Sequence, residues 1–580
     1  MIIHIDFASV GMAVPDRVNL FRAQAMRSVG GNGWRMSHNP PIPVLLDILD
    51  RVGITVMDEN RLFGNVSEYV FNMGELVKRD RNHPSVTIWS FCNEVGCEGS
   101  LEAGGPAFQA ITTQLDGSRP TLANMFTYND LLSKTIDVQG FSHQNRQAVD
   151  NCHRDMPTKP IFMSECCSCN TQRGEDEDGG GVSVEHNFNA PCVEGQTNAS
   201  NGVDYVAGSM VWTLFDYYGE PSFGGWPHVS STFGSFDLAG FPKAAVYWYR
   251  SWWLDNIADT AADKPFATGA NATVHIVEHY RAPPPPQPPA PSMAQLFAVT
   301  CDASANQAIK FTNGQLAFGD GTCVAVPACA NVSCPTLQLV PCSASDPAQQ
   351  FVYANQSFQS KSNPQGCLDL WADAGPNVGL YYCHVAPNQQ WTVSNGAVVS
   401  ATGVCMSNTQ AHGVGEYRTI HVYSSAPVVE LRANNVPLGR QSPIAPSFGS
   451  PSYATWAHVH WPAGTTLQAV ALDQHNTTLA IDARPPVGRV VAVALSLDCP
   501  TELSGTGSRV LLDGQDVALV RAAFVDAAGL VDNDANNSVT FSVVSGPGRI
   551  VGEEPSEKKK KKIREEEKKG EKKRKEKKRK

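Results

Sequence analysis

The sequence predicts a multidomain protein in which a (β/α)8 barrel, residues 1–258, precedes small β-sandwich domains. Three observations support this prediction. The 580 residues are too many for one core, and 42% of them are hydrophobic while 17% are charged, as in folded domains. Short apolar runs alternate with longer mixed segments over the first 250 residues or so. A cysteine-rich stretch of different composition then interrupts a β-rich region.

Eight short apolar segments of the barrel region are expected to be strands. Segments with apolar residues at helical spacing, such as Pro43–Val52, separate them. This alternation is typical of a (β/α)8 barrel, a TIM barrel. The expected strands are Ile2–Phe7, Gly33–Met36, Ile54–Met57, Val86–Phe91, Pro120–Met125, Ile136–Gly140, Pro160–Met163 and Ser209–Leu214.

The β-rich region after the barrel divides into two predicted immunoglobulin-like (Ig-like) β-sandwiches. The first comprises residues 265–282 and 415–484, with expected strands at Ala272–His279, Ile420–Val422, Val428–Leu431, Trp456–Trp461 and Leu467–Leu472. The second, residues 488–552, has three expected strands, Val490–Leu497, Val517–Val525 and Ser538–Ser545, which is few for a complete sandwich. Residues 283–292 are proline-rich and predict a semi-rigid linker.

The charge is distributed unevenly. The net charge is −11, but residues 553–580 hold 16 Lys and Arg against 8 acidic residues, so the rest of the chain carries −19. A body this acidic is a poor nucleic-acid binder. The tail is low in complexity and is expected to be disordered and solvated. No apolar run is long enough for a membrane helix. We therefore expect neither nucleic acid nor a membrane as a partner.

The cysteines and glycosylation sequons indicate an oxidising compartment. Eight of the 16 cysteines lie between Cys301 and Cys405, which favours a local disulfide framework. Seven N-x-S/T sequons accompany them, at Asn65, Asn198, Asn271, Asn331, Asn355, Asn476 and Asn536. We expect a secreted, endomembrane or vacuolar glycoprotein. No signal peptide is recognisable, and we expect it to be missing together with an N-terminal region.

Two glutamates fall at the carboxyl ends of expected strands, where the chemistry of a (β/α)8 barrel is located. Glu94 ends the fourth strand and Glu165 the seventh, so they face each other across the barrel mouth. Glycoside hydrolysis uses two such carboxylates, one to protonate the leaving oxygen and one to attack or to activate water. The alternative is that each glutamate merely ends a strand in a surface ion pair.

Several segments of residues 1–255 resemble glycoside hydrolase family 2, the β-galactosidase group. They are Arg35-Met36-Ser37-His38-Asn39-Pro40-Pro41, Val56-Met57-Asp58-Glu59-Asn60, Arg79–Val86, Asn93-Glu94, Val211–Pro221 and Phe241-Pro242-Lys243. The resemblance resumes in Ile420–Gly439 and Val539–Val551. It implies a retaining exo-β-glycosidase that hydrolyses terminal β-linked sugars, β-galactosides first of all. A β-glucuronidase or β-mannosidase of the same family remains open, although the N-x-K clamp of the glucuronidases is absent from the sequence.

The same resemblance implies roles for individual residues. Glu94 matches the general acid/base and Glu165 the nucleophile. Asn93 matches the residue that hydrogen-bonds the sugar 2-hydroxyl. His38 and Trp212 match positions of the sugar pocket, and Arg35 matches a residue that orients the nucleophile. The alternatives are a core histidine at position 38 and a packed core tryptophan at position 212.

The sequence departs from the family in three respects. Relatives carry two β-domains before the barrel, and none precedes it here, so we expect a fragment with weak activity or poor solubility. His143 occupies the position beside the nucleophile where many relatives have tyrosine. Glu59 matches a magnesium ligand of some relatives, but Arg61 replaces the expected histidine. We therefore expect no metal and no other cofactor, with Mg²⁺ at Glu59 possible but unsupported.

Residues 293–410 resemble a ricin-type β-trefoil lectin, inserted into the first sandwich. Cys301, Cys342 and Cys383 recur every 41 residues, each before a Gln-rich segment. The resemblance implies a sugar site at Asp369, with Trp371 and Asn388, in one repeat only, because Ala325 and Ser407 stand at the equivalent positions. It also implies the pairs Cys323–Cys342, Cys367–Cys383 and Cys301–Cys405, with Cys329–Cys334 left to pair locally. A trefoil that binds no sugar is the alternative.

Two further alternatives stay open. The cluster Cys166-Cys167-x-Cys169 with Cys192 could bind zinc, but its spacing is irregular and disulfides fit it better. The whole protein could be a carbohydrate-binding protein whose barrel is inactive. Its expected partners are in either case a carbohydrate substrate and a glycan ligand of the trefoil.

Overall fold

The computed structural model describes most of the chain. The residues outside this description are 5, 172–191, 194–196, 198, 201, 221–228, 255–272, 278–294, 301–306, 330–331, 371–376, 385, 395, 408–416, 444–452, 462–463, 498–509, 512, 533–534, 536 and 552–580. The chain divides into two compact units. One comprises Met1–Tyr280, His421–Thr455 and Thr466–Lys580, and the other comprises Arg281–Ile420 and Trp456–Thr465.

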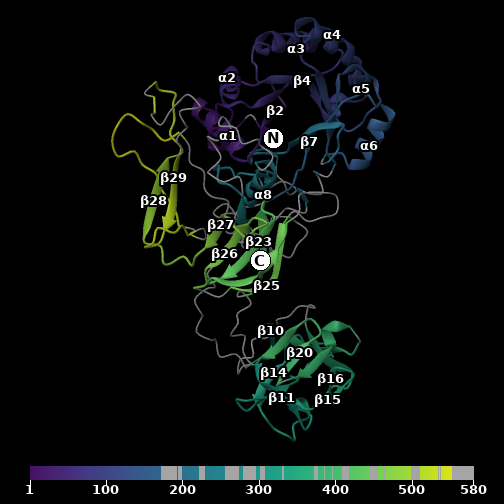
Figure 1. Cartoon of the computed structure of the whole chain (residues 1–580), viewed down its shortest axis with the longest axis vertical. Helices are drawn as coiled ribbons and strands as arrows, with labels where there is room; N and C mark the ends of the chain where they lie inside the picture. The colour runs from purple at the N-terminus through teal and green to yellow at the C-terminus, as the bar shows by residue number, and fades with distance from the viewer. Residues whose placement is uncertain are drawn as a thin grey trace, which may run out of the picture. The chain divides into compact units, whose positions relative to one another are not determined.

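Eight parallel strands form the barrel of the first unit, each beside its neighbour in chain order. Figure 1 shows them inside an arc of helices. After the last strand, Leu214 N donates a hydrogen bond to Ile2 O at 3.0 Å, which brings this segment against the first strand. The predicted fold class is confirmed. The strands are β1 (Ile2–His4), β2 (Gly33–Ser37), β3 (Thr55–Glu59), β4 (Val86–Asn93), β5 (Thr121–Met125), β6 (Val138–Ser142), β7 (Ile161–Cys166) and β8 (Val206–Val211).

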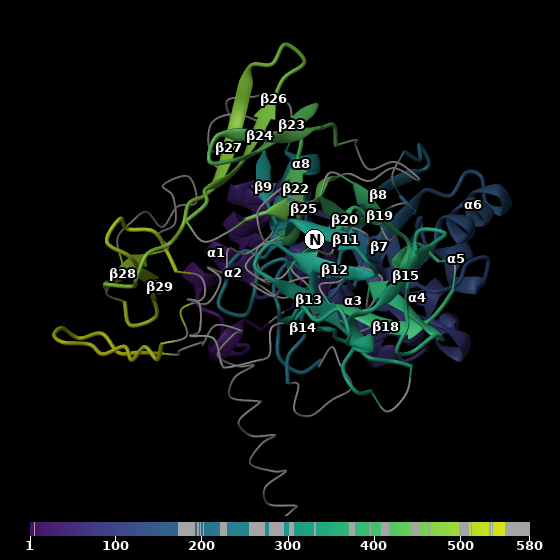
Figure 2. The ribbon, with the colours of Figure 1, turned by 90° about the horizontal axis from the view of Figure 1, so that it is seen from below.

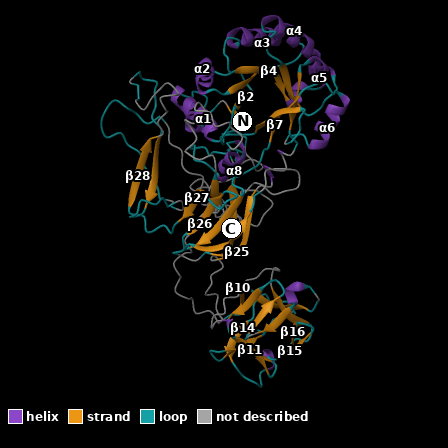
Figure 3. Ribbon diagram, in the orientation of Figure 1, coloured by secondary structure: helices purple, strands orange, loops and turns teal. Residues whose placement is uncertain are grey.

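The helices cover the outside of these strands, as Figure 3 shows. In α2 the sequence explains the boundaries: Pro43 starts the helix, and Gly53 ends it in the left-handed conformation, with φ 75°. None of the described helices is long and apolar enough to cross a membrane. The helices are α1 (Asp16–Ser28), α2 (Pro43–Val52), α3 (Ser67–Asp80), α4 (Gly105–Leu115), α5 (Leu131–Thr135), α6 (Arg146–Asp155) and α8 (Ala244–Trp253).

The first sandwich contains two antiparallel sheets, β25-β22-β9 and β24-β23-β26-β27. The second sheet is visible in Figure 2. Strands β24 and β27 were not predicted, because their side chains are half or fully exposed and their hydrophobic patterns are weak. The strands are β9 (Val274–Ile276), β22 (Tyr417–Ser424), β23 (Val428–Ala433), β24 (Val436–Gln441), β25 (Tyr453–His460), β26 (Leu467–Leu472) and β27 (Thr478–Arg484).

The cysteine-rich module is an insertion between two neighbouring strands of this sandwich. Strand β9 pairs antiparallel with β22, with Ile276 opposite Val422, although the module separates them in sequence. The module has three sheets of four strands, the number that three trefoil repeats require. Its strands are β10 (Phe297–Thr300), β11 (Ile309–Thr312), β12 (Gln315–Phe318), β13 (Thr322–Ala325), β14 (Gln338–Pro341), β15 (Phe351–Ala354), β16 (Ser357–Ser360), β17 (Gly366–Leu370), β18 (Val378–Tyr382), β19 (Trp391–Ser394), β20 (Ala397–Ser400) and β21 (Val404–Ser407).

The region of the second predicted sandwich forms one described hairpin, β28 (Ala492–Leu497) with β29 (Val520–Val525). The expected third strand, residues 538–545, has no strand conformation. The segment before β29 is fastened to the barrel, because Arg17 Nε and Nη2 donate to the two carboxylate oxygens of Asp516 at 2.7 and 2.6 Å.

A buried ion pair after β8 explains why the segments around Phe215-Asp216 and Pro242-Lys243 occur together. Lys243 Nζ donates to Asp216 Oδ1 at 2.9 Å and to Thr171 O at 2.7 Å. Both charged side chains are fully buried. Asp216 also accepts the backbone N–H of Gly234 at 2.8 Å. The pair therefore joins three loop segments at one end of the barrel.

We predict that Lys243→Met lowers the free energy of unfolding by about 3–5 kcal/mol, because the Asp216 carboxylate would remain buried without its counter-charge. The exposed pair Lys78–Glu75 on α3 provides the control. Lys78→Met is expected to cost less than about 1 kcal/mol. Urea unfolding followed by intrinsic fluorescence compares the two variants. Equal losses would contradict the structural role of the buried pair.

Candidate active site

The two predicted catalytic carboxylates lie close together at the carboxyl ends of their strands. Glu94 directly follows β4, and Glu165 is the last residue but one of β7. One carboxylate oxygen of each, with a ring nitrogen of His143, forms a group in which all atoms lie within 4.8 Å of one another. The sequence placed these side chains at one barrel mouth, and the structure brings them into direct proximity.

Three donors surround the carboxylate of Glu165, which is only 5% exposed. Arg35 Nη1 donates to Oε2 at 2.5 Å, and Asn124 Nδ2 donates to the same oxygen at 3.3 Å. His143 Nε2 lies 3.2 Å from Oε1. The histidine that replaces the family's tyrosine thus contacts the predicted nucleophile directly.

These donors keep Glu165 ionised. Burial alone would raise the pKa of its carboxyl, but the hydrogen bond from His143 and the charges of Arg35, His38 and His143 outweigh burial and lower the pKa to about 2. Since the folded-state pKa lies below the ordinary value of 4.5, this group stabilises the fold above that pH. The stabilisation is lost as the pH falls toward 2.

Arg35 on β2 is the centre of the hydrogen-bond network. Its guanidinium is fully buried and donates from Nε to Glu59 Oε2 at 2.8 Å and from Nη2 to Asn93 Oδ1 at 2.8 Å, besides its bond to Glu165. Burial works against the charged form, but the two carboxylates outweigh it and raise the pKa of Arg35. A single side chain therefore connects β2, β3, β4 and β7.

Glu59 is a poor metal ligand in this setting. Oε2 accepts hydrogen bonds from Arg35 and from Ser90 Oγ, each at 2.8 Å, and Oε1 lies 2.8 Å from His38 Nδ1. Although burial opposes it, the charge of Arg35 lowers the pKa of Glu59. Because a guanidinium already neutralises this carboxylate and its oxygens accept from protein donors, the residues do not fit Mg²⁺.

Glu94 has an unusual backbone. Its φ is +48°, in the left-handed region that residues with a Cβ atom rarely occupy. Ser142 Oγ, at the end of β6, donates to Glu94 Oε1 at 2.6 Å. His143 and Cys167, after β6 and within the segment that follows Glu165, also have positive φ, 49° and 71°. Non-glycine residues in this conformation are thus found at the ends of β4, β6 and β7.

His38 and Trp212 lie next to each other, and His38 contacts Arg35. Their rings stack with centroids 5.4 Å apart and an angle of 4° between planes. Trp212 Nε1 donates to Tyr217 Oη at 3.0 Å, and Tyr217 in turn donates to Glu220. The peptide bonds Ser37–His38 and Trp212–Thr213 are cis. His38 contacts Arg35 and Glu59, which places it among the predicted site residues. Trp212 is only 6% exposed and packs in an apolar cluster with Met210 and Tyr217, as the core-packing alternative expects.

Sequence reasoning missed three residues of the site: Asn124, Ser142 and Tyr217. Asn124 Nδ2 donates to Asn93 Oδ1 at 2.7 Å as well as to Glu165, so it links the ends of β4 and β7. Each of Asn124 and Ser142 lies at the carboxyl end of an expected strand. Polar residues at these ends were the signal that could have identified them.

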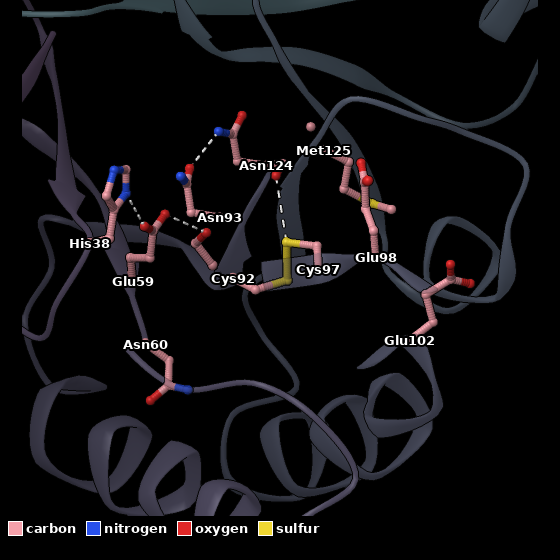
Figure 4. Close-up of a disulfide and its surroundings, with 12 residues drawn as sticks. His38, Glu59, Asn60, Cys92, Asn93, Cys97, Glu98, Glu102, Asn124 and Met125 are labelled. Carbon is pink, nitrogen blue, oxygen red and sulfur yellow. Dashed lines mark hydrogen bonds and ion pairs between the residues drawn. A yellow bond between two sulfur atoms is a disulfide. The ribbon is translucent and has the colours of Figure 1, made fainter. Parts of the chain in front are cut away.

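Each of the two glutamates has a disulfide next to it in the chain: Cys92–Cys97 encloses Glu94, and Cys166–Cys167 follows Glu165. Figure 4 shows the first of them, beside Asn93. The zinc alternative for the cluster after Glu165 is wrong, because Cys166 is bonded to Cys167 and Cys169 to Cys192. A sulfur in a disulfide cannot act as the thiolate ligand that zinc requires. Among the described cysteines, Cys152 is free and buried.

The trefoil residue Asp369 lies in a hydrogen-bonded setting on β17. Its Oδ2 accepts from Gln389 Nε2 at 2.7 Å and from Asn388 Nδ2 at 3.1 Å, and His384 Nε2 lies 3.5 Å away. Trp371, the third predicted member, lies outside the described residues. In the first repeat, Ala325 offers no carboxylate, and Gln349 donates to Asp346 instead.

Three of the predicted trefoil disulfides are present: Cys323–Cys342, Cys367–Cys383 and Cys329–Cys334. The first two link equivalent hairpins of successive repeats, with Cα atoms 4.9 Å apart in each. Cys405 is disulfide-bonded, but Cys301 lies outside the described residues. The pair Cys301–Cys405 therefore stays a prediction.

A (β/α)8 barrel with a close pair of glutamates at the ends of β4 and β7 has the arrangement of a glycoside hydrolase. Residues 4–171 match the family model described as glycosyl hydrolases family 2, TIM barrel domain. Residues 312–426 match the ricin-type β-trefoil lectin domain, and residues 415–480 match a domain of unknown function. The chain thus contains a domain similar to the family 2 barrel and an inserted domain similar to the ricin-type lectin.

The curated relatives include enzymes of two specificities. The β-galactosidase BoGH2A of Bacteroides ovatus is 31% identical over 323 residues, which cover 43% of this chain and 38% of the relative. A β-glucuronidase of Rattus norvegicus is 40% identical over 225 residues, which cover 33% of this chain and 34% of the relative. The chain therefore spans well under half the length of either relative.

A solved structure shares the fold. A family 2 glycosyl hydrolase from Bacteroides cellulosilyticus aligns with a TM-score of 0.53 at 19% identity, covering 91% of this chain and 52% of that chain. At this level of identity the likeness concerns the fold alone. It agrees with a barrel followed by β-sandwich domains.

We predict that His143→Phe moves the ionisation of Glu165 to higher pH by about one unit, because one of its donors is lost while its burial remains. A 2-deoxy-2-fluoro glycoside with a dinitrophenyl leaving group reports this ionisation, since labelling needs an ionised nucleophile and little acid assistance. The labelling rate of the variant should fall at a higher pH than that of the wild type. An unchanged pH dependence would contradict the contact.

In the trefoil, we predict that Asp369→Asn abolishes retention of the full chain on a galactosyl resin, because the carboxylate that would accept sugar hydroxyls is lost. Glu165 is first blocked by the 2-fluoro glycoside, so that the barrel does not contribute. The amide keeps the shape of the side chain, and the melting temperature should change little. Ser407→Ala, at the equivalent position of another repeat, is the control. Unchanged retention of Asp369→Asn would favour a trefoil that binds no sugar there.

Proposed function

We propose that this protein is a retaining exo-β-glycosidase that acts on terminal β-linked sugars, with β-galactosides as the favoured substrates. The observation that carries the proposal is the distance of at most 4.8 Å between carboxylate oxygens of Glu94 and Glu165. Retaining enzymes keep their carboxyl groups about 5–5.5 Å apart, whereas inverting enzymes need about 6.5–9.5 Å for an intervening water. This proximity supports direct attack by a carboxylate.

In the proposed reaction, Glu165 attacks the anomeric carbon while Glu94 gives its proton to the glycosidic oxygen. The bond to the aglycone breaks, the alcohol leaves, and a covalent glycosyl-enzyme remains on Glu165. Glu94, now ionised, takes a proton from water, and this water attacks the anomeric carbon. The sugar leaves with its original configuration, and both carboxyl groups return to their starting states.

The surrounding residues supply binding and orientation. Asn93 Oδ1 accepts bonds from Arg35 and Asn124, so its Nδ2 is the group offered to a sugar hydroxyl. His38 is partly exposed and Trp212 stacks on it from the buried side, so His38 is the ring of this pair that is open to a pyranose. Arg35 fixes the nucleophile at 2.5 Å. These contacts support the roles inferred from the family.

A β-glucuronidase is the second candidate, favoured by the 40% identity to the rat β-glucuronidase over the matched region. The absence of an N-x-K segment argues against it. A β-mannosidase is the third candidate. The similarity to the β-galactosidase BoGH2A, which extends over more residues than the similarity to the rat enzyme, supports the β-galactosidase proposal. The trefoil would add a glycan-binding site, and the disulfides and sequons support an oxidising, secretory location.

A panel of 4-nitrophenyl β-glycosides tests the sugar specificity. The proposal expects the highest kcat/KM for the β-galactoside. A preference for the β-glucuronide would establish the second candidate. If every glycoside of the panel is inert while the chain still binds sugar, the protein is a carbohydrate-binding protein with an inactive barrel.

The two glutamates are predicted to respond differently to removal. Glu165→Ala should abolish turnover, and azide should restore it with an inverted glycosyl azide as the product, because a small anion can occupy the vacated space. Glu94→Ala should lose about 10²–10⁴-fold on poor leaving groups but far less on activated aryl glycosides, which need little protonation. Rates and product configurations follow from absorbance and NMR. Near-normal turnover by Glu165→Ala would refute the assignment.

A further inference from the structure

A short covalent ring encloses the proposed acid/base. Cys92, the last residue but one of β4, is bonded to Cys97, which ends the 3₁₀ segment Glu94–Cys97. The two Cα atoms are 5.4 Å apart. The ring contains Asn93, Glu94, Val95 and Gly96, and therefore both residues of the family's Asn-Glu pair. Figure 4 shows the disulfide beside Asn93, with Cys97 facing Asn124.

The disulfide itself is held firmly by the barrel. Cys92 and Cys97 are 3% and 0% exposed, and both belong to the main apolar core of the barrel with Phe91 and Phe108. Cys97 Sγ also lies 3.5 Å from the backbone oxygen of Asn124 on β5. Because both ends of the ring are buried, the ring can transmit the rigidity of the barrel to the residues that it encloses.

The enclosed residues need such support. Glu94 has φ +48°, a conformation that costs free energy for any residue with a Cβ atom and persists only where the surroundings impose it. The next residue, Val95, is 73% exposed and so gains little from packing. The side chain of Glu94 has one described hydrogen-bond donor, Ser142 Oγ. Local packing alone therefore provides weak restraint.

The nucleophile has a separate means of support. Arg35 and His143 hold the carboxylate of Glu165 through contacts that involve neither cysteine. Asn124 gives the longest contact, 3.3 Å, and is the one of the three whose backbone oxygen also lies beside Cys97. Loss of this disulfide should consequently disturb the acid/base far more than the nucleophile. This asymmetry distinguishes a positioning role from a general contribution to stability.

We propose that the Cys92–Cys97 disulfide is a positioning element for proton transfer: it holds Glu94 in the conformation that reaches the glycosidic oxygen. The inference rests on the proposed retaining glycosidase. It assigns to these two cysteines a role in cleaving unactivated substrates, whose leaving groups require protonation. A dithiol would open the ring by giving two electrons and two protons to the Cys92–Cys97 disulfide, and the dithiol itself would become a disulfide. Opening the ring in this way should slow the same proton-transfer step.

The test compares Cys92→Ala/Cys97→Ala with the wild type on two substrates, methyl β-galactoside and 2,4-dinitrophenyl β-galactoside. Rates are expressed per active site, counted by the dinitrophenol released when a 2-deoxy-2-fluoro galactoside labels Glu165. This normalisation removes the effect of misfolded molecules. Cys367→Ala/Cys383→Ala, which removes a trefoil disulfide, is the matched control. A thermal melt of each variant records any loss of stability.

We expect kcat/KM on the methyl galactoside to fall at least tenfold more than on the dinitrophenyl galactoside. Azide should also accelerate turnover of the dinitrophenyl substrate by the variant, because azide attacks the glycosyl-enzyme without a base. The control variant should keep the wild-type ratio of kcat/KM on the two substrates, and azide should not change its turnover.

Equal losses on both substrates, or no loss, would overturn the positioning role. A variant that labels no active site would contradict the independent support of the nucleophile and would overturn it as well. Wild-type protein that hydrolyses neither substrate nor any other glycoside would instead refute the proposed function, on which the inference depends.

Discussion

The buried guanidinium of Arg35 is the interaction on which the rest of the site depends. A cation without solvent must be compensated, and here Glu59 and Glu165 both lie within hydrogen-bond distance of it. This compensation has two consequences. Together with the hydrogen bond from His143 it lowers the pKa of Glu165, although burial opposes this, so that the proposed nucleophile stays ionised. It also engages Glu59, which is thereby removed from the role of a metal ligand.

The barrel holds the two proposed catalytic carboxylates by different physical means. Glu165 is fixed through charge and hydrogen bonds to Arg35, His143 and Asn124, which come from three other strands or their ends. Glu94 is placed mainly through its backbone, which the end of β4 and the following turn force into a positive φ. A nucleophile must remain charged, whereas an acid/base must exchange its proton with the substrate and with water. The charged hydrogen-bond network around Glu165 and the smaller number of contacts around Glu94 suit these needs.

Much of the architecture could be predicted from the sequence because the barrel strands are continuous apolar runs at regular intervals. Glu94 and Glu165 could be found because they end such runs. Asn124 and Ser142 end runs too, but short polar residues there fit surface turns equally well, and only the structure shows their contacts. Strands β24 and β27 escaped prediction because both expose most of their side chains. Polar and apolar residues alternate over residues 538–545 as in a strand, but these residues do not form one. Alternation alone does not provide a neighbouring strand with which to pair.

The central claim is that the closeness of Glu94 and Glu165 makes the reaction a double displacement. Proton NMR of the first product, recorded before the free sugar equilibrates, tests this claim most directly. Hydrolysis of an aryl β-galactoside by the wild-type protein should release the β-anomer first, with the α-anomer appearing only as the sugar mutarotates. Initial release of the α-anomer would mean that water attacks the substrate directly and would contradict the account.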